Sequence, residues 1–274
     1  MQIFNLENEY RKIVNTAGPF HVLEYFQDTS IAPGMATEEY FMTKMNVHRR
    51  QIVADLTGSN TIVAQAGAMQ WMVGNVSLTS GVKGVGDLFG KMVKGAVTKE
   101  SAAKPVYTGA GVLVLEPTYK YLLLEDIGQW GNGMTIEDGM FLACEGTVQS
   151  RVIHRKNLSS AVMGGEGFFN LSLYGRGIAV LESNVPASEL VTIELNNEEL
   201  KIDGNLAVCW SSDLDFTTER SSRSLVGSAI SGEGLVNVYR GTGRVLMAPV
   251  TPTGSLYSAS TSTSGKPAAK NSNT

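Results

Sequence analysis

Short apolar runs separated by turn residues make up most of the chain. Runs rich in Val, Ile, Leu and aromatic residues occupy positions 112–115, 168–173 and 191–195, and each is shorter than a typical helix. Asn-Gly, Asp-Gly and Gly-Gly pairs interrupt such runs, and these pairs favour the tight turns that join neighbouring strands. A further candidate strand at 21–26 follows Pro19. Many short strands with frequent turns predict an all-β fold of the sandwich or barrel type.

One segment departs from this pattern and has helical spacing. Apolar residues between positions 84 and 98 recur three or four residues apart, which places them on one face of a short helix. Lysines border this stripe, so the helix could dock on a partner or on an anionic membrane surface. The candidate interaction residues are Phe89, Lys91, Met92 and Lys94. Two glycines weaken it as an independent helix, which favours an insertion that covers the open side of the first β unit.

Glycines repeat at a fixed interval along the chain. Three Gly-x-Gly steps lie 66 residues apart both times, and each precedes an apolar run that predicts a buried strand. The steps are formed by Gly109 and Gly111, by Gly175 and Gly177, and by Gly241 and Gly243. Repetition at a fixed period predicts three similar strand-turn-strand units, at about 40–117, 118–183 and 184–250.

A glutamate precedes each Gly-x-Gly step by eight or nine residues. Glu100, Glu166 and Glu233 hold these positions. If three equivalent units surround an axis, the three carboxylates would meet there and could bind a cation. A glutamate next to glycines also accepts backbone N–H bonds and pins a turn or bulge. Its recurrence in every unit favours this structural role, so we expect no metal at these positions.

Composition places the chain among ordinary globular proteins. Of its 274 residues 43% are hydrophobic and 18% are charged, which is enough to bury a substantial core. A net charge of -4 provides no overall positive field for a nucleic-acid backbone. The sequence has neither an apolar run of membrane-spanning length nor the pattern of a signal peptide, so we expect a cytoplasmic protein. We expect an N-terminal extension at 1–36, the repeated β domain at 37–250 and a flexible tail at 251–274.

The residue types needed for common catalytic sites are absent or badly spaced. His21, His48 and His154 are scattered and form no His-x-His pair, which argues against a histidine metal centre. The sequence lacks a Gly-x-Ser-x-Gly nucleophile elbow followed by a histidine. We therefore expect a protein that is not an enzyme and uses no cofactor or metal.

The two cysteines fall at the same place in successive units. Cys144 and Cys209 each stand five residues after a turn glycine, Gly139 in one case and Gly204 in the other. Equivalent positions in separate units point the same way, and unpaired cysteine is readily buried. We expect both thiols to be buried and free.

Several short motifs recur in a fixed order. They are Gly165-Glu166-Gly167-Phe168-Phe169-Asn170 with Gly175-Arg176-Gly177, Gly232-Glu233-Gly234-Leu235-Val236-Asn237 with Gly241-Thr242-Gly243, and Ala66-Gly67-Ala68-Met69 with Gly74-Asn75-Val76. In this order and spacing the chain resembles the altered-inheritance-of-mitochondria protein 24 family over about residues 40–250. The first unit differs from the family pattern, because Lys99-Glu100-Ser101-Ala102-Ala103 replaces the glycine and aromatic pair.

The resemblance carries expectations for fold and function. It implies a TRAP-like, β-sandwich-rich fold, related in shape to the tryptophan RNA-binding attenuation protein, in which three similar units surround a pseudo-threefold axis. Eukaryotic members of the family are linked to organisation of the mitochondrial inner membrane, and bacterial members have no settled activity.

The residues and the resemblance together predict a non-enzymatic scaffold or interaction protein that forms a homo-oligomer with partners still unknown. RNA is one alternative partner, because two short basic clusters could contact phosphates, although such clusters are more typical of solvated hairpin ends. These clusters are His48, Arg49 and Arg50, and Arg151, His154, Arg155 and Lys156. An anionic membrane surface is a second alternative partner, and a small ligand or cation in a carboxylate-lined site is a third.

Overall fold

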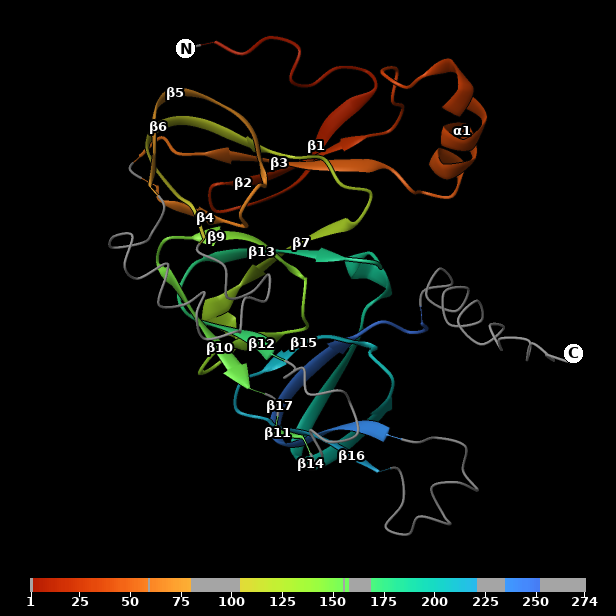
Figure 1. The fold of residues 1–274 in the computed structure, drawn as a ribbon, viewed down its shortest axis with the longest axis vertical. Helices are drawn as coiled ribbons and strands as arrows, with labels where there is room; N and C mark the ends of the chain where they lie inside the picture. Colours follow the sequence, from red (N-terminus) through yellow and green to blue (C-terminus); the bar gives the residue numbers. More distant parts are fainter. Residues whose placement is uncertain are drawn as a thin grey trace, which may run out of the picture.

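Two β-sheets arranged along the long axis of the molecule contain most of its regular structure (Figure 1). The computed structural model describes residues 2–58, 60–79, 104–154, 156–157, 169–220 and 235–251. The helix predicted between positions 84 and 98 and nearly all of the C-terminal tail lie outside these residues. Within them the prediction of a mostly β fold is confirmed.

The first sheet has nine strands in the described part of the chain. Their order is β1-β2-β3-β6-β4-β9-β13-β7, and β5 pairs with the free side of β6. The strands are β1 (Arg11–Ala17), β2 (Phe20–Tyr25), β3 (Arg49–Asp55), β4 (Ile62–Ala64), β5 (Met69–Thr79), β6 (Val106–Leu115), β7 (Tyr121–Asp126), β9 (Phe141–Glu145) and β13 (Ile178–Ser183).

This sheet curls into a nearly closed barrel. Its closing contact lies between Arg50 of β3 and Thr118, three residues before β7. The Arg50 amide donates a hydrogen bond to the Thr118 carbonyl oxygen at 2.7 Å, and the Thr118 amide donates to the Arg50 carbonyl oxygen at 2.9 Å. Two backbone hydrogen bonds thus join the sides of the sheet, and we call this contact the seam.

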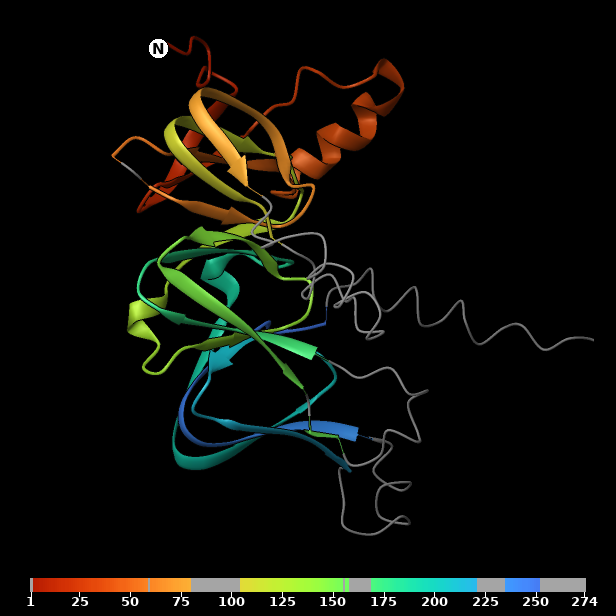
Figure 2. The ribbon, with the colours of Figure 1, turned by 60° about the vertical axis from the view of Figure 1, so that its left-hand side comes forward.

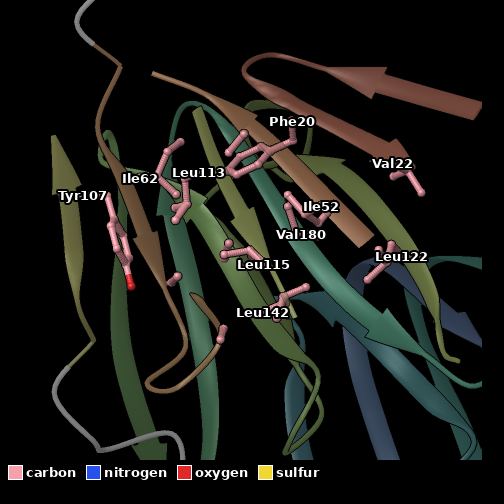
Figure 3. Packing of buried hydrophobic residues seen from close by; sticks show 14 of the residues in the cluster. Phe20, Val22, Ile52, Ile62, Tyr107, Leu113, Leu115, Leu122, Leu142 and Val180 are labelled. Atoms are coloured by element: carbon pink, nitrogen blue, oxygen red, sulfur yellow. The ribbon is translucent and has the colours of Figure 1, made fainter. Parts of the chain in front are cut away.

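Apolar side chains from strands all round the curled sheet fill its interior. Figure 3 shows them pointing toward one another from β2, β3, β4, β6, β7, β9 and β13. Those labelled are Phe20, Val22, Ile52, Ile62, Tyr107, Leu113, Leu115, Leu122, Leu142 and Val180. Burial of this apolar surface is the main stabilising contribution to the N-terminal half.

The second sheet lies toward the C-terminal half and has eight strands among the described residues. Its order is β10-β12-β8-β15-β17-β16-β11, with β14 on β17. The strands are β8 (Met134–Ile136), β10 (Val148–His154), β11 (Lys156–Asn157), β12 (Phe169–Gly175), β14 (Val191–Asp203), β15 (Ala207–Ser211), β16 (Asp215–Arg220) and β17 (Leu235–Met247). Figure 2 shows this sheet below the first one, with β9 and β13 of the first sheet facing it. A second apolar cluster, which includes Trp130, Leu173 and Leu181, draws on strands of both sheets and joins the two halves.

The N-terminal segment contributes more than the sequence indicates. The candidate strand at 21–26 is present as β2, and β1 and β2 add two strands to the first sheet beside β3. A helix, α1 (Ala36–Lys44), follows a short 3-10 turn at Pro33–Met35 and leads into β3. The apolar residues of α1 form no stripe toward the core, so the helical period that would predict it is absent.

Both cysteines are buried and free, as predicted. Cys144 lies in β9 and Cys209 in β15, and both belong to the apolar cluster that joins the two halves. Burial raises the pKa of the Cys144 thiol to about 12, although the nearby Lys104 ammonium lowers it in part. Burial likewise raises the pKa of the Cys209 thiol well above its ordinary value.

Thiol labelling should therefore be slow in the native protein. The thiolate is the reactive form, so burial and a raised pKa both reduce the rate at pH 8. We expect native labelling with a maleimide or a disulfide reagent to be more than about a hundredfold slower than labelling in denaturant. Mass spectrometry of the whole chain measures the extent of labelling. Rapid labelling of the native protein would contradict this placement of the cysteines.

Candidate functional site

The first Gly-x-Gly step lies in the middle of β6, where β6 runs alongside β5. A side chain at Gly111 would collide with the Val73 carbonyl oxygen, and one at Gly109 would collide with the Asn75 carbonyl oxygen. Gly109 also has a φ of +119°, a conformation that residues with side chains rarely adopt. Glycine at this step therefore allows the two strand backbones to approach closely.

The other two steps lie where a strand passes from one partner to the next. Gly175 ends β12, which pairs with β10, and Gly177 directly precedes β13, which pairs with β9. Gly241 and Gly243 lie in β17 between the part that pairs with β16 and the part that pairs with β15. These glycine steps therefore have a structural role, because they lie where a strand leaves one partner and joins the next.

The described residues contain no group of three or more His, Cys, Asp or Glu side chains placed to hold a metal ion.

The carboxylates of the repeat and the residues of the candidate interaction helix fall outside the described part of the chain. They are the glutamates Glu100, Glu166 and Glu233 and the helix residues Phe89, Lys91, Met92 and Lys94. The structure therefore shows where the glycines of the repeat lie. The role of the three glutamates in pinning a turn or binding a cation stays a prediction.

A charged cluster lies beside the seam and was not apparent in the sequence. Arg50 Nη2 lies 2.8 Å from Glu24 Oε1, and His48 Nδ1 lies 2.6 Å from the same oxygen. The Arg50 guanidinium also stacks on the Tyr121 ring, 4.0 Å from its centre, and donates to the Asn46 carbonyl oxygen at 3.3 Å. Arg50 is only 4% exposed, so its charge is compensated inside the protein. A hollow of about 200 Å³ adjoins this cluster.

The interpretation of positions 48–50 as a solvated basic cluster is wrong for two of its three members. His48 and Arg50 are buried and bonded to Glu24, so they cannot contact an external phosphate. Arg49 is partly exposed but forms an ion pair with Asp28 at 2.9 Å. The physical reason is the long-range pairing of β2 with β3, which brings Glu24 opposite Arg50.

Polar contacts from the same region fasten α1 to the sheet. Glu39, the one residue of α1 that is buried, accepts a hydrogen bond from Tyr119 Oη at 3.1 Å. Arg49 Nε in turn donates to Tyr119 Oη at 3.0 Å. The Thr43 carbonyl oxygen lies 3.2 Å from His48 Nε2. The attachment of α1 therefore depends on hydrogen bonds more than on apolar packing.

The most exposed apolar strand of the first sheet is β5. Within the described residues it pairs with β6 alone, so its second edge carries no strand. Met72, Val73 and Leu78 are 38%, 37% and 49% exposed. The strand contains neither a charged residue nor a proline, and these are the features that commonly protect a sheet edge. The uncharged run at 69–79 was visible in the sequence and could have drawn attention to this edge.

A cleft of about 300 Å³ lies between the turns that precede β5 and β9. Its lining includes Gly67, Gly139 and the apolar Phe141, together with three charged side chains. Two of these, Lys120 and Glu182, form an ion pair at 2.7 Å, which leaves Glu116 as the remaining carboxylate of the cleft. The cleft is large enough for a small polar molecule.

Breaking the charged cluster beside the seam should destabilise the fold. Glu24→Gln leaves the buried Arg50 charge without its carboxylate, so we expect the free energy of unfolding in urea to fall by about 3–5 kcal/mol. The double variant Glu24→Gln with Arg50→Met should lose less than Glu24→Gln alone, because no unpaired charge is left inside. Lys201→Met, which removes an exposed ion pair with Glu199, is the control and should cost less than about 1 kcal/mol. Equal losses for Glu24→Gln and Lys201→Met would contradict this reading.

Comparisons with known proteins identify a family, a relative and a similar solved structure. Residues 43–250 match the family model described as Mitochondrial biogenesis AIM24. An uncharacterized protein of Streptococcus pyogenes serotype M6 is 29% identical over 199 residues, which cover 70% of this chain and 77% of that protein. A crystal structure of a Streptococcus pyogenes protein has the same fold, with a TM-score of 0.57 and 24% identity over 79% of this chain and 94% of that one. Among the described residues no helix is long and apolar enough to cross a membrane. The match over most of its length shows that the chain belongs to the Mitochondrial biogenesis AIM24 family.

Proposed function

We propose that this protein is a non-enzymatic scaffold or interaction protein that assembles into homo-oligomers. The observation that carries the proposal is β5, an exposed strand of eleven residues with apolar side chains, whose outer edge no strand covers within the part of the chain that the structure describes. Such an edge has unpaired backbone N–H and C=O groups that can add a strand from a second molecule. We propose that β5 of one copy pairs with β5 of another.

A comparison with β14, a long edge strand of the second sheet, supports β5 as the site of assembly. β14 also pairs with one strand alone among the described residues, but it is lined with charges. These are Glu194, Glu198, Glu199, Lys201 and Asp203. On β17 beside it, Arg240 contacts Glu199, and it donates to Glu219 Oε2 at 2.8 Å. Charged side chains of this kind oppose strand addition, so β14 is protected where β5 is not.

We further propose that the chain contains three copies of one hairpin around a pseudo-threefold axis. In the first copy β5 pairs with β6, in the second β9 and β10 pair with β13 and β12, and in the third β15 and β16 pair with β17. A register irregularity near the start of each hairpin supports the equivalence.

Superposition of the three hairpins in an experimental structure tests this symmetry. Closed threefold symmetry requires successive rotations of about 120 degrees that bring the Gly-x-Gly steps onto one another. Rotations far from that value, or steps that fail to coincide, would refute the pseudo-threefold arrangement and leave the family assignment intact.

Two alternative functions have weaker support. Binding of RNA would use the basic cluster at 48–50, but Arg50 and His48 are buried. Binding of an anionic membrane surface depends on the helix predicted between positions 84 and 98, which lies outside the described residues. Binding of a small ligand or cation is supported by the cleft that contains Glu116, Lys120 and Glu182, although two of these charges neutralise each other.

Lysine substitutions on β5 test the proposed assembly. Met72→Lys combined with Leu78→Lys places two charges on the edge strand, and we expect the oligomer to dissociate to monomers in sedimentation velocity runs. Both side chains are exposed, so the unfolding midpoint should change little. Val191→Lys, at an exposed apolar position of β14, is the matched control and should leave the assembly unchanged. A wild-type protein that is monomeric at high micromolar concentration, or a double variant that still assembles, would overturn the β5 contact.

A further inference from the structure

The aromatic side chains of α1 and the methionines at its two ends are exposed, whereas Met42 within the helix is half-buried. Tyr40, Phe41 and Met45 are 58%, 60% and 75% exposed, and Met35 just before the helix is 50% exposed. The one fully buried residue of the helix is polar, because Glu39 accepts a hydrogen bond from Tyr119. Met42 and Thr43 on the same side are half-buried. A surface helix of a globular protein normally has the opposite arrangement. Clustered exposed apolar side chains of this kind mark an interaction surface.

The helix also carries two opposite charges on its exposed face. Glu38 lies three residues before Phe41 and Lys44 three residues after it, so all three share one side of the helix. Glu38 has no ion-pair partner among the described residues, and Lys44 contacts only the Tyr40 ring, 5.3 Å from its centre. The face is therefore apolar at its centre, acidic toward its start and basic toward its end.

This arrangement is complementary to itself. If a second copy of α1 runs antiparallel with Phe41 at the centre of the contact, Glu38 of each helix lies opposite Lys44 of the other. Closed twofold symmetry requires such reciprocal contacts: if Glu38 of one copy contacts Lys44 of the other, then Lys44 of the first contacts Glu38 of the second. Because the two charges of the face cancel, it offers no net attraction to an anionic membrane surface.

We propose that α1 is a self-association surface on which a second copy of this chain docks its own α1 in antiparallel orientation. The inference rests on the proposed function as a self-assembling scaffold, but it uses a surface distinct from β5. Figure 1 shows α1 beyond one end of the first sheet and β5 toward the other end. The short helix offers a small contact area, so the contact is weak alone and strengthens between copies already held together.

Site-specific cross-linking in the full chain tests the geometry directly. In an antiparallel pair centred on Phe41, two cysteines introduced by Phe41→Cys meet at the twofold axis and should form a disulfide-linked dimer under mild oxidation. Met45→Cys is the matched control, because the two copies of position 45 would be separated by about 12 Å along the helix axis and should not link. The native Cys144 and Cys209 are buried and should not interfere. Equal cross-linking at 41 and 45, or none at 41, would overturn the proposal.

Charge reversal gives an independent readout. Glu38→Lys and Lys44→Glu should each weaken the contact, because each variant places like charges opposite one another. An equimolar mixture of the two variants should restore association, since both ion pairs then form between unlike chains. Failure of the mixture to associate better than either variant alone would refute the pairing of Glu38 with Lys44.

Both experiments are repeated in the Met72→Lys, Leu78→Lys background to separate the two surfaces. Cross-linking at position 41 that persists there supports α1 whether or not β5 mediates assembly. Loss of the position-41 link in the wild-type background, with assembly through β5 retained, would reject the α1 contact alone. Vesicles of phosphatidylcholine and phosphatidylserine test lipid as the occupant of this surface. If the wild-type protein binds these vesicles and Phe41→Cys forms no cross-link, the surface is assigned to lipid and self-association is rejected.

Discussion

The closure of the first sheet at Arg50 and Thr118 is the contact on which the N-terminal half depends. Two backbone hydrogen bonds join β3 to the segment before β7, and the Arg50 side chain turns inward to Glu24 at the same point. Closure lets apolar side chains from seven strands share one interior. It also fixes His48 and Arg49, whose contacts hold α1 in place. Three consecutive residues, 48–50, thus connect the backbone of the barrel, its buried charges and the outer helix.

The sequence predicted the mostly β fold class. Short apolar runs and glycine turns indicated an all-β chain. Both signals could be used because each involves residues that are close together in the sequence. The charged cluster could not be predicted in the same way. Glu24 and Arg50 stand far apart in the chain and meet only because β2 pairs with β3. An arginine next to His48 and Arg49 in the sequence is typical of a solvated basic cluster, so sequence alone placed Arg50 at the surface although it is buried.

The N-terminal helix shows a different limit of sequence patterns. Helices are recognised by an apolar stripe that faces the core, whereas α1 exposes both of its aromatic residues to solvent. The segment that did show an apolar stripe, between positions 84 and 98, lies outside the described residues. The exposed edge of β5 is an intermediate case, because the absence of charge is visible in the sequence but its position at an edge is not.

The order of strands in the first sheet has a consequence for how the protein is made. β1 to β3 are synthesised first, yet their sheet is completed by β7, β9 and β13, the last of which ends at Ser183. Until about two-thirds of the chain has left the ribosome, the apolar interior that β2 and β3 share with β4 and β6 lacks part of the cover from β7, β9 and β13. The barrel of the N-terminal half is therefore completed only after the middle of the chain has been made, so its folding is coupled to residues far downstream.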